Sequence, residues 1–259
     1  MPDLVTRDAI LHVETDGEGE PVTVLAHGIT NNCRELSQLT PLFPGTKVRF
    51  CFRGHGHSSA PETGYAFADF ARDIDDVAKA YGARLAVGTS MGQAALCTLL
   101  AQDPDRFERM VFLLPGGIDQ PFEHADKYLQ MADLMSTLPP EDAIETILND
   151  PERTAGYVKA PWLREIDKMM WHEQNTVGLA RAIRDIVNDV PLADGEVLRR
   201  VTAPVLMIAR EGDPIHPAEV ALRLAELLPN SELHMFHDEV DMFEAMPRLV
   251  MRVNDFLYG

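Results

Sequence analysis

Short apolar runs bounded by turn-forming residues recur along this chain, and they predict the strands of a sheet. The run Leu85-Ala86-Val87 is a good example, since a glycine follows it directly. The predicted strands cover residues 10–14, 22–26, 48–52, 85–88, 110–114, 205–209 and 233–236.

Between these runs, apolar residues return every three or four positions, the period of a helix with one buried face. This pattern predicts helices at residues 67–81, 93–102, 218–228 and 242–257. Strands that alternate with helices indicate a mostly parallel sheet with helices on both faces. The sequence therefore predicts an α/β fold with a central sheet of about eight strands.

One segment, residues 119–198, breaks this alternation because it shows helical patterns only, interrupted by prolines. We expect a helical cap there, inserted into a core domain made of residues 1–118 and 199–259. An insertion between two parallel strands would cover their carboxyl ends. Four large cap side chains are candidates for lining a substrate pocket, although such residues more often pack a core: Met135, Trp162, Met170 and Trp171.

The most informative stretch is Gly88-Thr89-Ser90-Met91-Gly92, between a predicted strand and a predicted helix. In this context, one glycine two residues before a serine and another two residues after it are typical of a nucleophile elbow. The sharp turn strains the serine backbone, and small neighbours relieve crowding across it. The alternative is a loop serine flanked by glycines.

Composition narrows the choice of partners. The chain of 259 residues has 23 basic and 41 acidic side chains, a net charge of −18. This charge repels phosphate backbones and anionic lipid, so neither nucleic acid nor a membrane is an expected partner.

Three cysteines without a paired motif indicate free thiols in a reducing compartment. No secretion signal or membrane span is evident, so we expect a cytoplasmic protein, of unknown oligomeric state.

Four motifs follow one another in a recognisable order. His27-Gly28-Ile29 follows one strand, and Arg53-Gly54-His55-Gly56 follows the next strand. The serine elbow comes third, and Gly212-Asp213-Pro214-Ile215-His216-Pro217 follows a later strand. From about residue 11 to residue 257, the chain resembles the α/β-hydrolase superfamily, in its capped subgroup of small esterases, lactonases, ring-cleavage hydrolases and thioesterases.

The resemblance implies a role for each motif. Ser90 is expected to be the nucleophile, with Asp213 as the acid that orients a histidine base. The backbone amides of Ile29 and Met91 are expected to bind the oxyanion. Gly28 lets the backbone approach the substrate, and Asn31 is a candidate polar contact.

The histidine base is the irregular part of the pattern. In the family it lies after the last strand, where this chain has residues 236–247 with His237 at the strand's end. Two other histidines follow Asp213. His216 is close to Asp213 in sequence and is expected to cap the next helix, whereas His234 lies within a strand. We therefore expect His237 to be the base.

The resemblance implies a serine hydrolase that acts on a carboxylic ester, lactone or thioester of a small apolar molecule without a cofactor or metal. His55 and His57 lack suitably spaced ligand partners. The irregular histidine leaves two alternatives open. One is a lyase or cyclase on the same scaffold, such as an enzyme of secondary metabolism that eliminates acetate. The other is a binding protein without catalytic activity.

Overall fold

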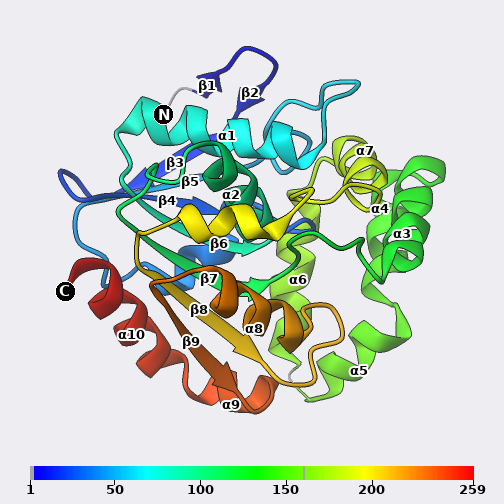
Figure 1. Ribbon diagram of the computed structural model, residues 1–259. Coiled ribbons are helices and arrows are strands. Elements are labelled where there is room, and N and C mark those ends of the chain that lie inside the picture. The colour runs from blue at the N-terminus through cyan, green and yellow to red at the C-terminus, as the bar shows by residue number, and fades with distance from the viewer. Residues whose placement is uncertain (1–2, 160) are drawn as a thin grey trace.

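The computed structural model describes residues 3–159 and 161–259, and a mostly parallel sheet with helices on both faces forms its centre (Figure 1). The strands are β1 (Leu4–Val5), β2 (Ile10–Leu11), β3 (Val13–Asp16), β4 (Val22–Ala26), β5 (Thr46–Phe50), β6 (Leu85–Ser90), β7 (Arg109–Pro115), β8 (Val205–Arg210) and β9 (Ser231–Phe236). The helices are α1 (Phe67–Tyr81), α2 (Met91–Gln102), α3 (Ala125–Thr137), α4 (Pro140–Leu148), α5 (Pro151–Lys159), α6 (Trp162–His172), α7 (Thr176–Ile186), α8 (Ala218–Leu227), α9 (Glu239–Glu244) and α10 (Met246–Tyr258), with short 3-10 helices η1 (Glu35–Leu39) and η2 (Gly195–Arg200).

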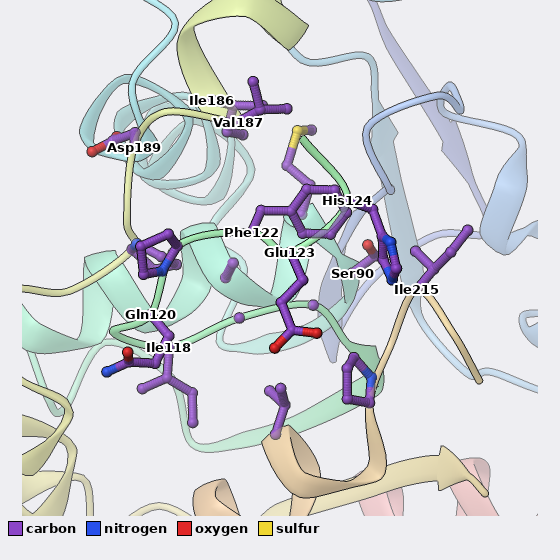
Figure 2. A pocket seen from close by; sticks show the side chains of 18 of the residues that line it. Ser90, Ile118, Gln120, Phe122, Glu123, His124, Ile186, Val187, Asp189 and Ile215 are labelled. Carbon is purple, nitrogen blue, oxygen red and sulfur yellow. The ribbon is translucent and has the colours of Figure 1, made fainter. Parts of the chain in front are cut away.

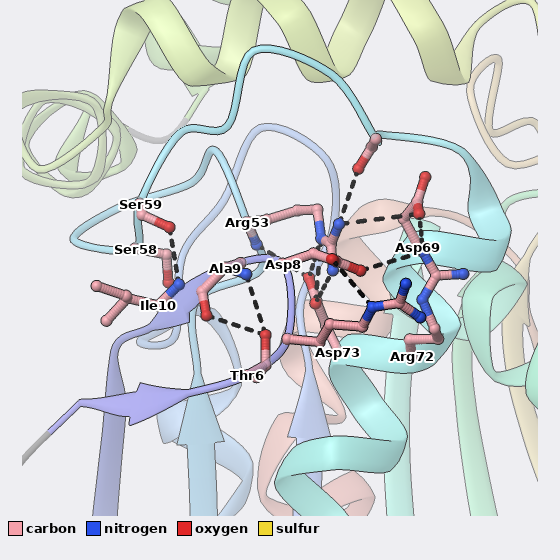
Figure 3. Close-up of polar contacts among 12 residues, drawn as sticks. Thr6, Asp8, Ala9, Ile10, Arg53, Ser58, Ser59, Asp69, Arg72 and Asp73 are labelled. Atoms are coloured by element: carbon pink, nitrogen blue, oxygen red, sulfur yellow. Dashed lines mark hydrogen bonds and ion pairs between the residues drawn. The ribbon is translucent and has the colours of Figure 1, made fainter.

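The predicted α/β fold is confirmed, with seven strands in the main sheet where about eight were expected. Their order is β3-β5-β4-β6-β7-β8-β9, and β3 alone runs antiparallel to its neighbour. The predicted strand at residues 10–14 is divided between two sheets, because β2 pairs with β1 and β3 pairs with β5. Side-chain hydroxyls bind backbone amides there. The Ser59 hydroxyl accepts a hydrogen bond from the Ile10 amide (Figure 3), and the Ser58 hydroxyl accepts one from the His12 amide.

Strand side chains alternate between two apolar layers, as the period of two in a strand requires. On β6, Ala86 packs with the layer that includes α1, α2 and α8, whereas Val87 packs with the layer that includes η1 and α10. On β8, Met207 and Ile208 divide in the same way. The sheet is therefore buried on both faces, which leaves the ends of its strands as the place for a site.

The last predicted helix, residues 242–257, is two helices in the structure. α9 ends at Glu244, and α10 begins at Met246 with Pro247 in its first turn. Proline lacks the N–H that a helix interior needs and clashes with the preceding turn, but it is tolerated in the first turn. Pro247 therefore starts a new helix.

Residues 119–198 contain helices α3 to α7, and their described part contains no strand, as the sequence pattern predicts. Figure 1 shows these helices beyond the ends of the strands to which the arrowheads point, on the same side as the end of β7. In parallel sheets of this kind, ligands bind at the carboxyl ends of the strands. The helical segment thus lies where it can cover such a site.

A buried ion pair holds the loop after β5 to α1. Arg53 and Asp73 are 2% and 0% exposed, and Arg53 donates hydrogen bonds from Nε and Nη2 to the Asp73 carboxylate (Figure 3). The Arg53 backbone amide donates to the same carboxylate, and its Nη1 donates to the Gly64 carbonyl. This network fixes the loop that begins at Arg53 and continues to His55.

Candidate active site

Ser90 lies at the sharp turn that the elbow motif predicts. It ends β6 with φ 49° and ψ −112°, a strained conformation for a residue other than glycine, and α2 begins at Met91. A Cβ atom on Gly92 would lie 2.3 Å from the Ala26 carbonyl oxygen. Only glycine therefore lets α2 start this close to β4, which explains why the motif needs it.

Ser90, His216 and Asp213 form a chain of hydrogen bonds. His216 Nδ1 lies 3.1 Å from Asp213 Oδ2, and its Nε2 lies 3.0 Å from Ser90 Oγ. Since a carboxylate only accepts, Nδ1 carries the proton and Nε2 is left to accept from the serine hydroxyl. This arrangement orients the imidazole to take a proton from Ser90.

The expected position of His237 between Ser90 and Asp213 is wrong. Its side chain is 83% exposed, and its ring lies 3.4 Å from a carboxylate oxygen of Glu211. β9 ends at Phe236 and α9 begins at Glu239, so His237 lies in the short connection between them. His216 makes both contacts instead.

The role that the sequence pattern indicates for His216 differs from its place in the structure. We expected this residue to cap α8, but the N-cap position belongs to Pro217, so His216 lies in the loop before the helix. The backbone amides of Ile215 and His216 both donate to Asp213 Oδ1. This tight turn around the Asp213 carboxylate directs the His216 ring toward Ser90 although only three positions separate the two residues.

Asp213 is almost fully buried, at 6% exposure, and its charge is well stabilised. Burial alone would raise the pKa of its carboxyl, but hydrogen bonds from His216 and from Arg210 Nε, at 2.8 Å, hold that pKa far below its usual value. The acid at this position therefore stays ionised over the working range of most enzymes.

The two amides expected to bind an oxyanion, those of Ile29 and Met91, belong to residues that line one cavity together with Ser90. Met91 is the first residue of α2, so its N–H has no partner within the helix. His55 Nε2 lies 2.6 Å from the Ile29 carbonyl oxygen, within hydrogen-bonding distance. The His27 ring accepts from the Phe52 amide and contacts the Gly28 carbonyl, as expected for a structural histidine beneath this loop.

Glu35 is a part of this region that sequence reasoning missed. Its carboxylate accepts from the Gly28 amide at 2.7 Å and from the Asn31 side chain. Burial raises the pKa of Glu35 to about 7, although the bonds from Gly28 and Asn31 oppose the shift. Asn31, predicted to contact substrate, donates a hydrogen bond to this carboxylate and is not among the described residues that line the cavity at Ser90.

The cavity at Ser90 has a volume of about 490 Å³ (Figure 2). Its walls come mainly from the loop after β7 and from residues 215–223 around the start of α8, with a smaller part from residues that follow α7. Figure 2 shows the Ser90 side chain at one end, near the His124 ring, and the Glu123 carboxylate pointing into the middle. The lining residues are Ile29, Phe67, Ser90, Met91, Ala94, Gly116, Gly117, Ile118, Asp119, Gln120, Pro121, Phe122, Glu123, His124, Tyr128, Ile186, Val187, Asp189, Pro191, Ile215, Pro217, Glu219, Val220 and Arg223.

The four cap side chains expected in the pocket are absent from the described lining residues. Met135, Met170 and Trp171 are buried within the helical segment, whereas Trp162 is 51% exposed. The apolar faces of α3 and α7 pack on each other, so Met135 fills the interior between the helices. Gly28 is also outside the lining and lies beside Glu35 and the Ser90 Cβ.

Charged groups on the cavity wall are mostly acidic. Asp119, Glu123, Asp189 and Glu219 contribute four carboxylates, and Arg223 contributes the guanidinium. Arg223 already faces carboxylates of Asp119 and Glu196, at 3.8 and 3.7 Å. The remaining wall is largely apolar.

The sequence model of the alpha/beta hydrolase family matches residues 23–246. A 2-(acetamidomethylene)succinate hydrolase from Mesorhizobium japonicum is 36% identical over 105 residues, which cover 39% of this chain and 37% of that protein. Carboxylesterase YbfK from Bacillus subtilis is 26% identical over 174 residues, covering 66% of this chain and 55% of that one. The matched regions thus span only part of each relative.

Among solved structures, an enol-lactonase from Burkholderia xenovorans superposes with a TM-score of 0.82 over the full length of both chains at 18% identity. At this identity the likeness shows a shared fold. Within the described residues, no helix is both long and apolar enough to cross a membrane.

Proposed function

Because the chain belongs to the alpha/beta hydrolase family, we propose that it hydrolyses a carboxylic ester, lactone or thioester through an acyl-enzyme on Ser90. The observation that carries this proposal is the His216 ring, which lies within hydrogen-bonding distance of Ser90 Oγ and Asp213 Oδ2. A serine hydroxyl is a weak nucleophile, and an oriented imidazole supplies the base that it needs.

In the proposed reaction, His216 Nε2 removes the proton from Ser90 as its oxygen attacks the substrate carbonyl. The amides of Ile29 and Met91 stabilise the oxyanion, and Asp213 stabilises the imidazolium. The imidazolium then protonates the leaving group as the carbonyl re-forms. A water molecule, deprotonated by His216, attacks the acyl-enzyme, and Ser90 recovers its proton when the acid is released.

We further propose that residues 119–198 act as a lid on a core formed by residues 1–118 and 199–259. Several lining residues lie at the two boundaries of this helical segment, among them Phe122, His124 and Val187. Closing such a segment over Ser90 would exclude bulk water and strengthen the oxyanion contacts.

The cavity wall supports a small, largely apolar substrate that is neutral or cationic. The relative from M. japonicum is named for a succinate derivative, which is a dicarboxylate. Here Arg223 already faces two carboxylates, and Glu123 and Glu219 add further negative charge. We therefore propose a different substrate class for this chain.

The experiment compares His216→Gln with His237→Gln on a chromogenic short-chain ester. We expect His216→Gln to lower kcat by at least about 1000-fold, because the serine loses its base, and His237→Gln to leave kcat within about twofold. Equal activity of wild type and His216→Gln, or loss in His237→Gln alone, would contradict the assignment.

Labelling by a fluorophosphonate probe tests Ser90 independently. The wild type should be labelled on Ser90, and Ser90→Ala should show neither labelling nor turnover while its melting temperature stays nearly unchanged. A wild-type serine that stays unlabelled would argue against acyl-enzyme chemistry.

A further inference from the structure

A cluster of metal-binding side chains lies where β3 meets the loop after β4. His12 directly precedes β3, Glu14 lies on it, and Cys33 lies in the loop that follows the Ile29 turn. One ligand atom from each of these residues lies within 4.8 Å of the other two. Cys33 is buried, whereas His12 and Glu14 are 24% and 28% exposed, so solvent reaches the cluster from one side. The proposed hydrolysis uses none of the three.

The His12 ring lies between two carboxylates. Its Nδ1 lies 3.1 Å from Asp3 Oδ1, and its Nε2 lies 3.5 Å from Glu14 Oε1. When Nδ1 donates its proton to Asp3, the lone pair of Nε2 is directed toward Glu14 and is available to a cation shared with that carboxylate. A carboxylate that orients a histidine in this way is the usual support for a metal-binding imidazole.

The separation of these two atoms also suits a shared ion. Nitrogen and oxygen ligands about 2.0 Å from one zinc ion in a tetrahedral site are roughly 3.3 Å apart. The other oxygen of Glu14, Oε2, lies 3.3 Å from Arg49 Nη2. Arg34 Nε lies farther from Oε1, at 3.9 Å.

Cys33 supplies a sulfur ligand. Its thiol is free and buried. One sulfur, one imidazole nitrogen and one carboxylate oxygen form a donor set that favours Zn²⁺ over harder ions such as Mg²⁺ or Ca²⁺.

We propose that His12 Nε2, Glu14 Oε1 and the sulfur of Cys33 bind one Zn²⁺ ion, with a water molecule in the fourth position. The thiol that binds the ion releases its proton to solvent. The ion would connect β3 to the loop that carries Ile29. Binding should therefore stabilise the fold around the proposed oxyanion site.

The test uses the full chain, stripped of metal and kept reduced, with ZnCl₂ or CoCl₂ as the only added ligand. We expect zinc to raise the Tm of the wild type and cobalt to produce a thiolate-to-metal absorption band. His12→Gln and Cys33→Ser should lose both signals. Asp3→Asn, which removes only the support of His12, should weaken zinc binding about 10- to 100-fold.

Cys97→Ala is the matched control, because Cys97 is a buried thiol on α2 that is hydrogen-bonded to Gln93. Its response to zinc and cobalt should equal that of the wild type. Circular dichroism of each metal-free variant shows whether it is folded. The proposal is overturned if the wild type shows no response or if Cys33→Ser keeps the cobalt band.

Discussion

The Asp213 carboxylate accepts hydrogen bonds from both the proposed base and an arginine. Arg210 Nε and His216 Nδ1 lie 2.8 and 3.1 Å from the same oxygen, Oδ2. The guanidinium therefore neutralises part of the charge that would otherwise stabilise an imidazolium at His216. Arg210 is held in turn by Glu239, whose carboxylate lies 3.4 Å from Nη1.

We predict that Arg210→Gln shifts the acidic limb of the pH–rate profile of ester hydrolysis to higher pH. The reason is that Asp213 then directs its full charge to His216 and stabilises the imidazolium. Arg210→Lys, which keeps a positive charge, should shift the limb less. Profiles of kcat/KM that coincide for all three proteins would show that Arg210 has no electrostatic effect on the base.

Glu35 gives a second prediction at the residue scale, which concerns how the stability of the fold depends on pH. Its pKa is about 7 in the folded protein and 4.5 ordinarily, so the folded state binds more protons than the unfolded state between these values. The contribution of this group to stability is therefore complete below pH 4.5 and is lost as the pH rises through 7. Urea unfolding at pH 5 and pH 7.5 should show that the free energy of unfolding falls less in Glu35→Gln than in the wild type.

Glu62→Gln serves as the control for this measurement, because Glu62 is exposed. It should follow the wild type at both pH values. A Glu35→Gln protein with the same dependence on pH as the wild type would contradict the argument.

At the scale of elements, the ion pair of Arg53 and Asp73 connects the loop after β5 to α1. We predict that Asp73→Asn lowers the free energy of unfolding by about 3–5 kcal/mol, because it leaves the buried Arg53 without its nearest counter-charge. Asp133→Asn breaks an exposed pair with Arg184 and should cost less than about 1 kcal/mol. Chemical denaturation of the two variants measures the difference, and equal costs would show that burial of the pair is unimportant.

Elements were predictable where local chemistry determines them. The turn at Ser90 follows from Gly92, which must approach the Ala26 carbonyl, and α1 follows from its periodic apolar face. The division of residues 10–14 depends on Ser58 and Ser59, almost fifty positions away, so no local pattern reveals it. The same holds for His216, whose position depends on the packing of its loop against the end of β6, and for Glu35, which becomes significant only when folding places it beneath Gly28.

Over the whole molecule, the net charge of −18 and the carboxylates of the cavity wall both produce a negative electrostatic potential. A field of one sign over a cleft attracts ligands of the opposite charge and repels those of the same charge. Salt at physiological concentration screens this effect beyond about 8 Å.

We therefore predict that esters with a quaternary ammonium group are hydrolysed with a higher kcat/KM than carboxylate-bearing esters of the same size. The ratio should fall as NaCl rises, because the long-range part of the attraction is screened. Glu123→Gln together with Glu219→Gln should reduce the ratio, while a neutral ester of similar size serves as the control. A ratio below one at low salt would reverse the proposed preference.

The loop of residues 211–217 supplies both Asp213 and His216, which leaves the turn between β9 and α9 without a part in the proposed proton transfer. In the proposed mechanism, the positions of β9, α9 and α10 are therefore not constrained by a catalytic side chain in this turn. A tag, a linker or a short foreign peptide inserted beside His237 would meet solvent, the Glu211 side chain and the Asp241 carboxylate. This turn is accordingly a natural attachment point for immobilising the protein with its reactive serine left untouched.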